Sequence, residues 1–405
     1  MCINYIKIGK NNKGGNLNKK KTKRQNGITL VALVVTIIIL LILATISIQS
    51  LTNTGLFKKA QEAKEKTQNA TENQAKTLNE YEDELNKYIS GTISKQPVKK
   101  VEDNIGSVLS TTDNTELQDA YGNKIVVPAG FKIVSNSDTN NATTVDKGIV
   151  IEDVTLGATA GSQFVWIPVG TIYTDSEHTE AKKKTIELNR YTFDLNGKPT
   201  AQGEKVIETY YSETASKRNT VAKDINAFKT SVATNGGYYI ERYEARTTTK
   251  RTAEGNALTQ ITEKGTDQIY NYVKQPQAAK LSQEIYNSNK FTSDLMNSYA
   301  WDTATLFLQT CGTNATYSRQ TRVSSALSQT GTNTESTKDV QCNVYDMASN
   351  VYELTTETST FSNSPCVSRG SAYTNSNVYT ISHRYDNISN SYDYIGFRPI
   401  IYLTI

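Results

Sequence analysis

The stretch VYDMASNVYELT, residues 344–355, decides the fold predicted for the C-terminal part of this 405-residue chain. Two shorter pieces follow it, SRGSAY at 368–373 and IGFRP at 395–399. From about Val108 onward, short runs of Val, Ile, Tyr and Phe alternate with Gly, Asn and Asp, which is typical of strands and turns. Such runs lie at 124–128, 148–151, 164–168 and 237–240.

One segment of this region has helical spacing. Apolar residues recur over 293–310 at three- and four-residue steps, which predicts one helix there. Two hydrophilic stretches, 245–265 and 313–339, are expected to be long surface loops. The order of elements lacks the repeated strand–helix–strand pattern of a parallel sheet, so the predicted class is α+β.

The three C-terminal pieces, in this order and spacing, resemble the formylglycine-generating enzyme family, also called sulfatase-modifying factors. The pieces FVWIPV at 164–169 and YIERYE at 239–244 are similar to the early strands of that family. The resemblance covers roughly residues 110–405. It implies a mixed domain with a variant of the C-type lectin fold over 108–405.

The resemblance does not extend to the oxidase chemistry. That family uses a cysteine pair shortly after its Arg-Gly-Gly-Ser-like motif to bind copper and engage the substrate cysteine. In this chain the sequence AYTNSNVYTISHRYDN follows Ser371 and contains no cysteine, and Cys366 precedes the motif. Soft thiolates are what a copper(I) site needs. We therefore expect no catalytic residues and no enzyme, with a degenerate sulfatase-modifying enzyme as an alternative.

The cysteines and histidines indicate no zinc site. Cys311, Cys342 and Cys366 form no CxxC and no Cys/His pair with metal-ligand spacing, and only two histidines are present. One disulfide is compatible with three cysteines. Cys342 and Cys366 are the nearer pair in sequence, but sequence alone leaves the pairing open.

Asn350 and Glu353 match a calcium site of the resembled family, so calcium is a candidate cofactor. Calcium prefers six to eight hard oxygen ligands, and two side chains alone do not supply them. The alternative is that Asn350 makes a turn while Glu353 hydrogen-bonds to backbone. Arg369 and Arg398 are expected to tie the terminal strands together rather than to act in catalysis.

The segment 372–394 has the composition of a binding loop. Tyr offers a large contact area with few rotatable bonds, and Ser and Asn adapt their hydrogen bonds. Some lectin-like members of the resembled family bind ligands here, and in some the position is diversified by retroelements. The alternative is a polar loop shaped only by turn requirements. The predicted ligand-binding residues are Tyr373, Asn375, Asn377, Tyr379, Tyr385, Asn387, Tyr392 and Asp393.

Near the N-terminus, ITLVALVVTIIILLILATISI spans residues 28–48 without a charged residue. A helix of this length is about 30 Å long, which equals the thickness of a bilayer core. Eight basic residues and no acidic residue precede it, which would hold that side in the cytoplasm and the rest of the chain outside. We expect a transmembrane helix at 28–50 of a single-pass cell-membrane protein.

The piece KRQNGITLVAL at 23–33 resembles the cleavage and methylation motif of type IV prepilins and type II secretion pseudopilins. The resemblance implies that prepilin peptidase cuts after Gly27 and methylates the amine of Ile28. Two positions depart from the family, because Ile28 replaces the usual Phe and Ala32 replaces the usual Glu. The second departure argues against assembly as a major pilin. A plain anchor or a secretory signal is the alternative.

The predicted organisation is a basic leader at 1–27, the transmembrane helix at 28–50, a stalk helix at 51–90, a linker at 91–107 and the lectin-like domain at 108–405. Without residues 1–27 the formal charge falls from +4 to −4, so the body lacks the positive field of a nucleic-acid binder. We expect a minor pilin-like protein whose extracellular head binds an unknown surface ligand. Other pilins or pseudopilins are expected partners, and a structural pilin without a ligand is the alternative.

Overall fold

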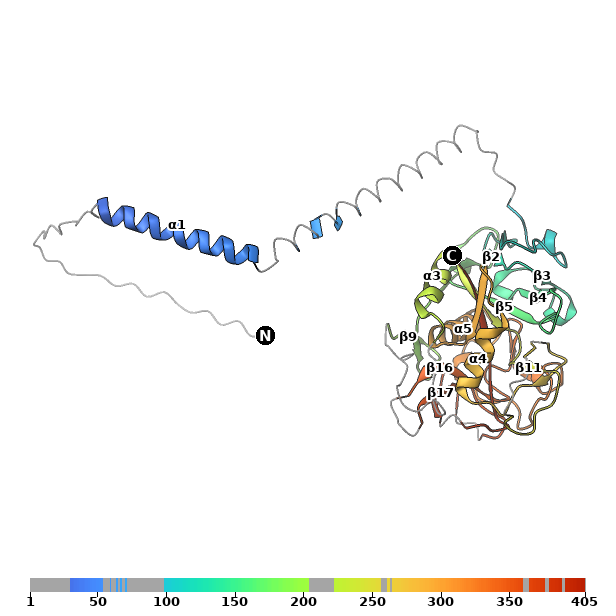
Figure 1. Ribbon diagram of the computed structural model, residues 1–405. Helices are drawn as coiled ribbons and strands as arrows, with labels where there is room; N and C mark the ends of the chain where they lie inside the picture. Colours follow the sequence, from blue (N-terminus) through green and yellow to red (C-terminus); the bar gives the residue numbers. More distant parts are fainter. Residues whose placement is uncertain are drawn as a thin grey trace, which may run out of the picture. The chain divides into compact units, whose positions relative to one another are not determined.

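The structure is a computed structural model (Figure 1). It describes residues 30–53, 59, 63–64, 66–67, 70, 98–203, 222–255, 261–262, 264–359, 364–375, 379–387 and 390–404. The chain divides into two units, 1–95 and 96–405. The predicted leader 1–27 and its cleavage site at Gly27 and Ile28 lie outside the described residues, as do most of the predicted stalk and residues 91–97 of the predicted linker. The rest of that linker, 98–107, is described, and Val101 is buried in the core.

The first unit contains helix α1, Leu30–Asn53. Within the described chain, no helix has both the length and the apolar character that crossing a membrane requires. The prediction of a long N-terminal transmembrane helix is corrected by this finding.

The second unit has the mixed helix and sheet content expected of its sequence, and its main sheet has six antiparallel strands in the order β13-β20-β10-β5-β4-β3. Every residue of β10 and β20 is buried, because both are interior strands that are covered on both faces. Helix α3 contacts β10 and β20 on one side, and α5 contacts β5. The strands are β3 Phe131–Val134, β4 Val150–Asp153, β5 Gln163–Pro168, β10 Gly237–Glu241, β13 Phe291–Leu295 and β20 Pro399–Leu403.

A second sheet of four strands, in the order β18-β17-β16-β19, carries the C-terminal motifs. Its strands are β16 Tyr352–Thr358, β17 Cys366–Arg369, β18 Tyr385–Asn387 and β19 Ile395–Phe397. The β16–β19 pair is parallel and the other two pairs are antiparallel. The motif residues Arg369 and Glu353 are therefore direct neighbours across the sheet.

In the described part of the second unit, three α-helices, several short 3-10 helices and several two-stranded ribbons accompany the two sheets. Helix α5 is buried on all sides from Ser298 to Leu308, and the Asn297 side chain accepts the Ala300 N–H at 2.9 Å to cap its start. The helices are α3 Ile225–Asn235, α4 Gln275–Ile285 and α5 Ser298–Cys311. The ribbons are β1 Thr115–Gln118 with β2 Lys124–Val127, β6 Gly170–Tyr173 with β7 Lys183–Ile186, β8 Tyr191–Phe193 with β9 Pro199–Ala201, β11 Arg246–Thr247 with β12 Gln268–Ile269, and β14 Val340–Gln341 with β15 Val344–Tyr345.

Among the described residues, the buried apolar side chains form two core clusters. The larger one lies around the six-stranded sheet and α5 and includes Trp166 and Trp301. The smaller one joins α4 to the four-stranded sheet through Leu281, Leu354 and Phe397. Three tyrosines of the segment predicted to bind ligand, Tyr379, Tyr385 and Tyr394, pack against this smaller core from outside, so the second sheet is the platform for that segment.

Candidate functional site

The candidate site is a group of tyrosines over the four-stranded sheet, which we call the tyrosine face. Its members are Tyr352, Tyr373, Tyr379, Tyr385, Tyr392 and Tyr394. Tyr352 is the first residue of β16 and Tyr385 is the first residue of β18. Two strands of one sheet therefore place these tyrosine rings on the same side of the sheet. Tyr352 is buried, whereas 40% of Tyr392 is exposed and the other four are half-buried.

Close ring contacts hold the tyrosine face together. The rings of Tyr352 and Tyr385 stack with centroids 5.1 Å apart and planes within 7°, and the edge of Tyr379 meets Tyr385 at 5.2 Å. Tyr392 and Tyr394 form a second stacked pair at 5.0 Å. Such pairs contribute about 0.5–1.5 kcal/mol each beyond the area they bury. The rings are therefore fixed before any ligand arrives.

Polar contacts fix the phenol groups as well. The Tyr373 hydroxyl donates to Asp393 Oδ2 at 2.6 Å, and the Asn375 amide donates to the Tyr352 hydroxyl. Burial raises the pKa of Tyr352, and burial with the Asp393 carboxylate raises the pKa of Tyr373. Both phenols are consequently neutral hydrogen-bonding groups at physiological pH.

Backbone bonds anchor the end of the segment. The Tyr272 N–H donates to the Tyr392 carbonyl at 3.0 Å and the Tyr352 N–H donates to the Tyr394 carbonyl at 2.9 Å. The loop that carries the second stacked pair is thereby tied to the buried strand β16. A face built on a sheet and fixed at both ends loses little conformational entropy on binding.

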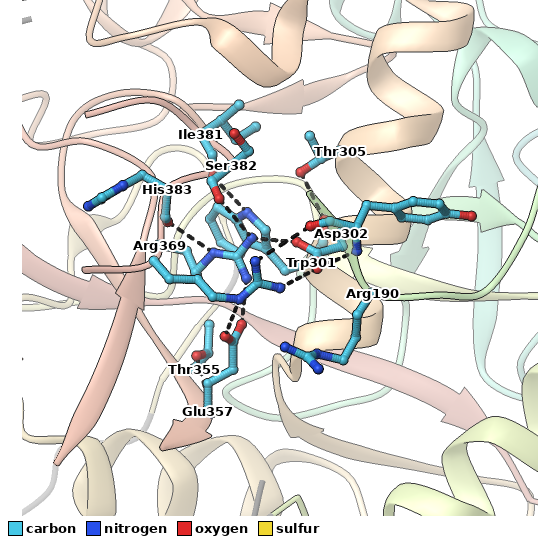
Figure 2. Close-up of polar contacts among 12 residues, drawn as sticks. Arg190, Trp301, Asp302, Thr305, Thr355, Glu357, Arg369, Ile381, Ser382 and His383 are labelled. Carbon is cyan, nitrogen blue, oxygen red and sulfur yellow. Dashed lines mark hydrogen bonds and ion pairs between the residues drawn. The ribbon is translucent and has the colours of Figure 1, made fainter. Parts of the chain in front are cut away.

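Beneath the tyrosine face lies a closed ring of buried ion pairs, the guanidinium–carboxylate ring of Asp302, Glu357, Arg369 and Arg384. Figure 2 shows the Arg369 guanidinium reaching both Glu357 and Asp302. Arg369 Nη1 lies 2.5 Å from Glu357 Oε1, Arg384 Nε lies 2.9 Å from Glu357 Oε2, and both arginines contact Asp302. Three of these side chains are fully buried, and Arg384 is 25% exposed.

The ring connects elements that are distant in sequence. Asp302 comes from α5, Glu357 from β16 and Arg369 from β17, and Asp302 Oδ2 also accepts the Tyr191 N–H of β8 at 2.9 Å. Burial alone would raise the pKa of Glu357, but the two guanidinium groups outweigh burial and lower it. Each buried charge therefore has an opposite partner, which is the condition for stable burial of ions.

The ring also positions the tyrosine face. Arg369 Nε donates to the His383 carbonyl at 3.1 Å, and the Trp301 indole N–H donates to the Ile381 carbonyl at 2.9 Å (Figure 2). Arg384 is the residue immediately before Tyr385. The backbone that carries Tyr379 and Tyr385 is thus held from below by buried groups.

The predicted ligand residues are only partly brought together. Tyr373, Asn375 and Asp393 contact one another or Tyr352, Tyr379 pairs with Tyr385, and Tyr392 stacks on Tyr394. Asn377 lies outside the described residues, and only the backbone of Asn387 is described, in β18.

The prediction did not include Tyr352 or Tyr394 among the ligand residues. Tyr352 lies in the NVYE piece and Tyr394 ends the Tyr-rich segment. Both positions therefore lay in segments that the sequence had already marked as candidates for function. Composition does not reveal that β17 lies between β16 and β18 in one sheet. That arrangement brings Tyr352 of the NVYE piece close to the Tyr-rich segment.

The candidate calcium ligands do not fit a calcium site. Both carboxylate oxygens of Glu353 accept hydrogen bonds from Arg398, at 2.6–3.2 Å. Asn350 has a left-handed backbone, its amide oxygen accepts the Ser328 N–H at 2.8 Å and its amide group donates to Glu244. Among the described residues, no cluster of three or more His, Cys, Asp and Glu side chains could hold a metal ion.

These contacts give the two arginines of the motifs structural roles. Arg398 also donates to the carbonyls of Glu241 and Tyr345, so it joins β10, β15 and β16. The expectation that Arg369 and Arg398 tie strands together agrees with these contacts.

The three described cysteines are free thiols. Cys311 and Cys342 line the same cavity of about 180 Å³, whereas Cys366 is buried in β17. Burial raises the pKa of Cys311 to about 12 and raises the pKa of Cys342 well above its ordinary value. Thiols held in the protonated form are poor nucleophiles and poor metal ligands.

Comparisons of the chain with protein-family models, with curated proteins and with solved structures find no match.

Proposed function

We propose that the second unit, 96–405, is a non-enzymatic binding module and that the tyrosine face is its ligand-binding surface. The observation that carries this proposal is the pair of stacked tyrosine couples, Tyr352–Tyr385 and Tyr392–Tyr394, on one fixed platform. Partly exposed aromatic rings that are already ordered are the anchors that most binding interfaces use. The ligand class that suits such a face is a macromolecular surface, protein or glycan.

The polar surroundings support the same role. Tyr373, Asn375 and Asp393 supply hydroxyl, amide and carboxylate groups at the edge of the rings. Aromatic anchors with adaptable polar neighbours are the usual composition of binding loops.

The experiment is binding of the full-length protein to an array of immobilised proteins and glycans, followed by alanine variants of the face. We expect Tyr392→Ala and Tyr379→Ala to weaken binding by roughly tenfold or more, as truncation of an aromatic anchor does. Tyr173→Ala is the matched control, because Tyr173 is also half-buried and also stacked, on His178, but lies outside the face. Equal losses in all three variants, or an array without bound protein, would contradict the proposal.

Prepilin-type processing at Gly27 and Ile28 stays a prediction, because these residues lie outside the described part of the chain. Its test is mass spectrometry of the mature N-terminus in cells that contain a prepilin peptidase. A methylated Ile28 at the terminus would support a pilin-like setting for the head, whereas an intact leader would argue against it.

A further inference from the structure

The second unit contains a cavity that shares no residue with the tyrosine face. It is a cavity of about 370 Å³ whose lining includes Arg242, Tyr243, Tyr345, Lys264 and Asp138. This volume is within the range of small-molecule sites. The cavity plays no part in the function proposed above.

The central group of this cavity is the guanidinium of Arg242, a residue that is only 2% exposed. Its Nη1 donates to Gln163 Oε1 at 2.7 Å and its Nη2 donates to the Asp138 carbonyl. Its Cζ lies 5.2 Å from the ring centroids of both Tyr243 and Tyr345. All four partners are neutral, and within the described residues Arg242 makes no salt bridge.

This arrangement differs from that of Arg246, Arg369 and Arg398, three other buried arginines in the same domain. Arg369 and Arg398 each pair with at least one buried carboxylate. A buried cation without an anionic partner is costly, and Arg242 Nε also lacks an acceptor among the described atoms. The cavity therefore contains a positive charge that an anionic ligand would neutralise.

The other charges that line the cavity leave it positive. Lys264 extends across Gly161, where a Cβ atom would lie 3.3 Å from its Cε, and it forms no ion pair among the described residues. Asp138 adds one exposed carboxylate. The nearby carboxylate of Glu152 is already bound by Lys132 at 2.9 Å. Two cations against one anion favour a ligand with a single negative charge.

We propose that this cavity, the Arg242 cavity, binds an acidic sugar through its carboxylate. A planar carboxylate matches the planar guanidinium, whereas a doubly charged phosphate would exceed the available positive charge. The Tyr243 and Tyr345 rings beside the guanidinium give an apolar wall for the body of the ligand. Thr266 and Thr332, both exposed at the cavity, supply hydroxyls that can bond to those of a sugar.

The test is calorimetric titration of the full-length protein with glucuronate and with glucose, which differ only in the carboxylate. We expect glucuronate to bind at least about tenfold more tightly than glucose, because only glucuronate pairs with the buried guanidinium. Added salt should weaken glucuronate binding by screening the charges. Equal affinity for the two sugars, or no heat from glucuronate at roughly 10 mM, would overturn the proposal.

Three variants locate the site. Arg242→Gln should abolish glucuronate binding, and its thermal midpoint shows whether the fold persists. Lys264→Met should weaken binding by about threefold to tenfold, whereas Asp138→Asn should strengthen it by a similar factor, because each change alters one charge at the cavity. Lys280→Met, on the exposed side of α4, is the matched control and should leave affinity unchanged.

The two smaller variants keep the proposal testable if Arg242→Gln unfolds. Weaker binding in both Lys264→Met and Asp138→Asn would contradict the charge argument. Tyr392→Ala should not change glucuronate affinity, so a failure at this cavity is distinguishable from a failure at the tyrosine face.

Discussion

Arg384 lies between His383 and Tyr385 in sequence, so its ion pairs with Asp302 and Glu357 fix the backbone from which both aromatic rings extend. One arginine thus has two roles, because it completes the buried ring and it orients the segment that we propose binds ligand. Arg384 can fill both roles because its side chain is only half-buried, at the edge of the ring.

At this scale we predict that Asp302→Ala destabilises the protein by roughly 3–5 kcal/mol, because it leaves two guanidinium groups facing one carboxylate in a buried site. Urea unfolding followed by circular dichroism measures the change. The control is Lys280→Ala, which removes an exposed ion pair with Glu284 and should cost less than about 0.5 kcal/mol. Similar small losses in both variants would refute a structural role for the ring.

The sequence predicted several tyrosines of the candidate site but not the charged residues that support them. Composition identified Tyr373, Tyr379, Tyr385 and Tyr392, because Tyr-rich polar segments are typical of binding loops. It could not identify Asp302 or Glu357 as their support, because ion pairs between residues dozens of positions apart depend on the tertiary fold and leave no local pattern.

At the scale of elements, the turn before β4 shows how a backbone contact selects glycine. Gly148 has φ of 77°, and a Cβ atom there would lie 1.9 Å from the Cys342 carbonyl oxygen. The Asn343 amide donates to the Gly148 carbonyl at 2.8 Å and to that of Thr139 at 3.0 Å. The chain near β14 and β15 therefore rests directly on this turn.

We predict that Gly148→Ala destabilises the protein by roughly 3 kcal/mol, the combined effect of a left-handed backbone and a steric clash. Gly106 is the matched control, since its φ is 74° but no atom lies within 4 Å of the place where an added methyl group would sit. Gly106→Ala should cost only about 1 kcal/mol, the backbone part alone. Thermal unfolding of the two variants separates the clash from the backbone preference, and equal losses would show that the contact with Cys342 relaxes freely.

The elements themselves were partly predictable from the sequence. The runs predicted as strands at 124–128, 164–168 and 237–240 correspond to β2, β5 and β10, because uninterrupted Val, Ile and Tyr suit buried strands. The single helix predicted over 293–310 was too long. Ser293 to Leu295 belong to strand β13, where pairing with β20 outweighs the helical spacing of the apolar residues.

Other elements left a weaker local signal. Helices α3 and α4 were not predicted, because each has only eleven residues and presents a short apolar face. Helix α3 buries Phe228 and Val232, and α4 packs through small side chains such as Ala278. The stretch 245–265 was expected to be a surface loop, but Arg246 and Thr247 are buried and pair with β12. Burial of polar residues depends on partners that are distant in sequence.

At the scale of the whole molecule, buried carboxyl groups set the response of stability to pH. Burial raises the pKa of Asp294 to about 6 and that of Asp346 to about 7. Both values are above those of an unfolded chain, so between about pH 4 and pH 7 these two groups bind more protons in the folded state than in the unfolded one. Stability contributed by these groups is therefore lost as pH rises through that window.

We predict that the free energy of unfolding decreases by on the order of 1 kcal/mol between about pH 5 and pH 7 through Asp294 alone. Asp294→Asn should remove that part of the slope, because an amide does not titrate. Glu284→Gln, on the exposed side of α4, is the matched control and should leave the slope unchanged. Denaturant unfolding across this pH range measures the slopes, and an identical slope in Asp294→Asn and the unaltered protein would refute the assignment.

Strand β20 lies between β13 and β10 inside the six-stranded sheet, although it is the last of these strands along the chain. During translation, β10 is synthesised long before β20. The backbone groups on one edge of β10 therefore stay unpaired until β20, which ends at residue 403, has left the ribosome. An exposed, largely apolar edge of this kind is a template for wrong pairing with other nascent chains. Biosynthesis of this second unit should consequently depend on a chaperone that shields the unfinished sheet, and slow codons before residue 399 should increase aggregation.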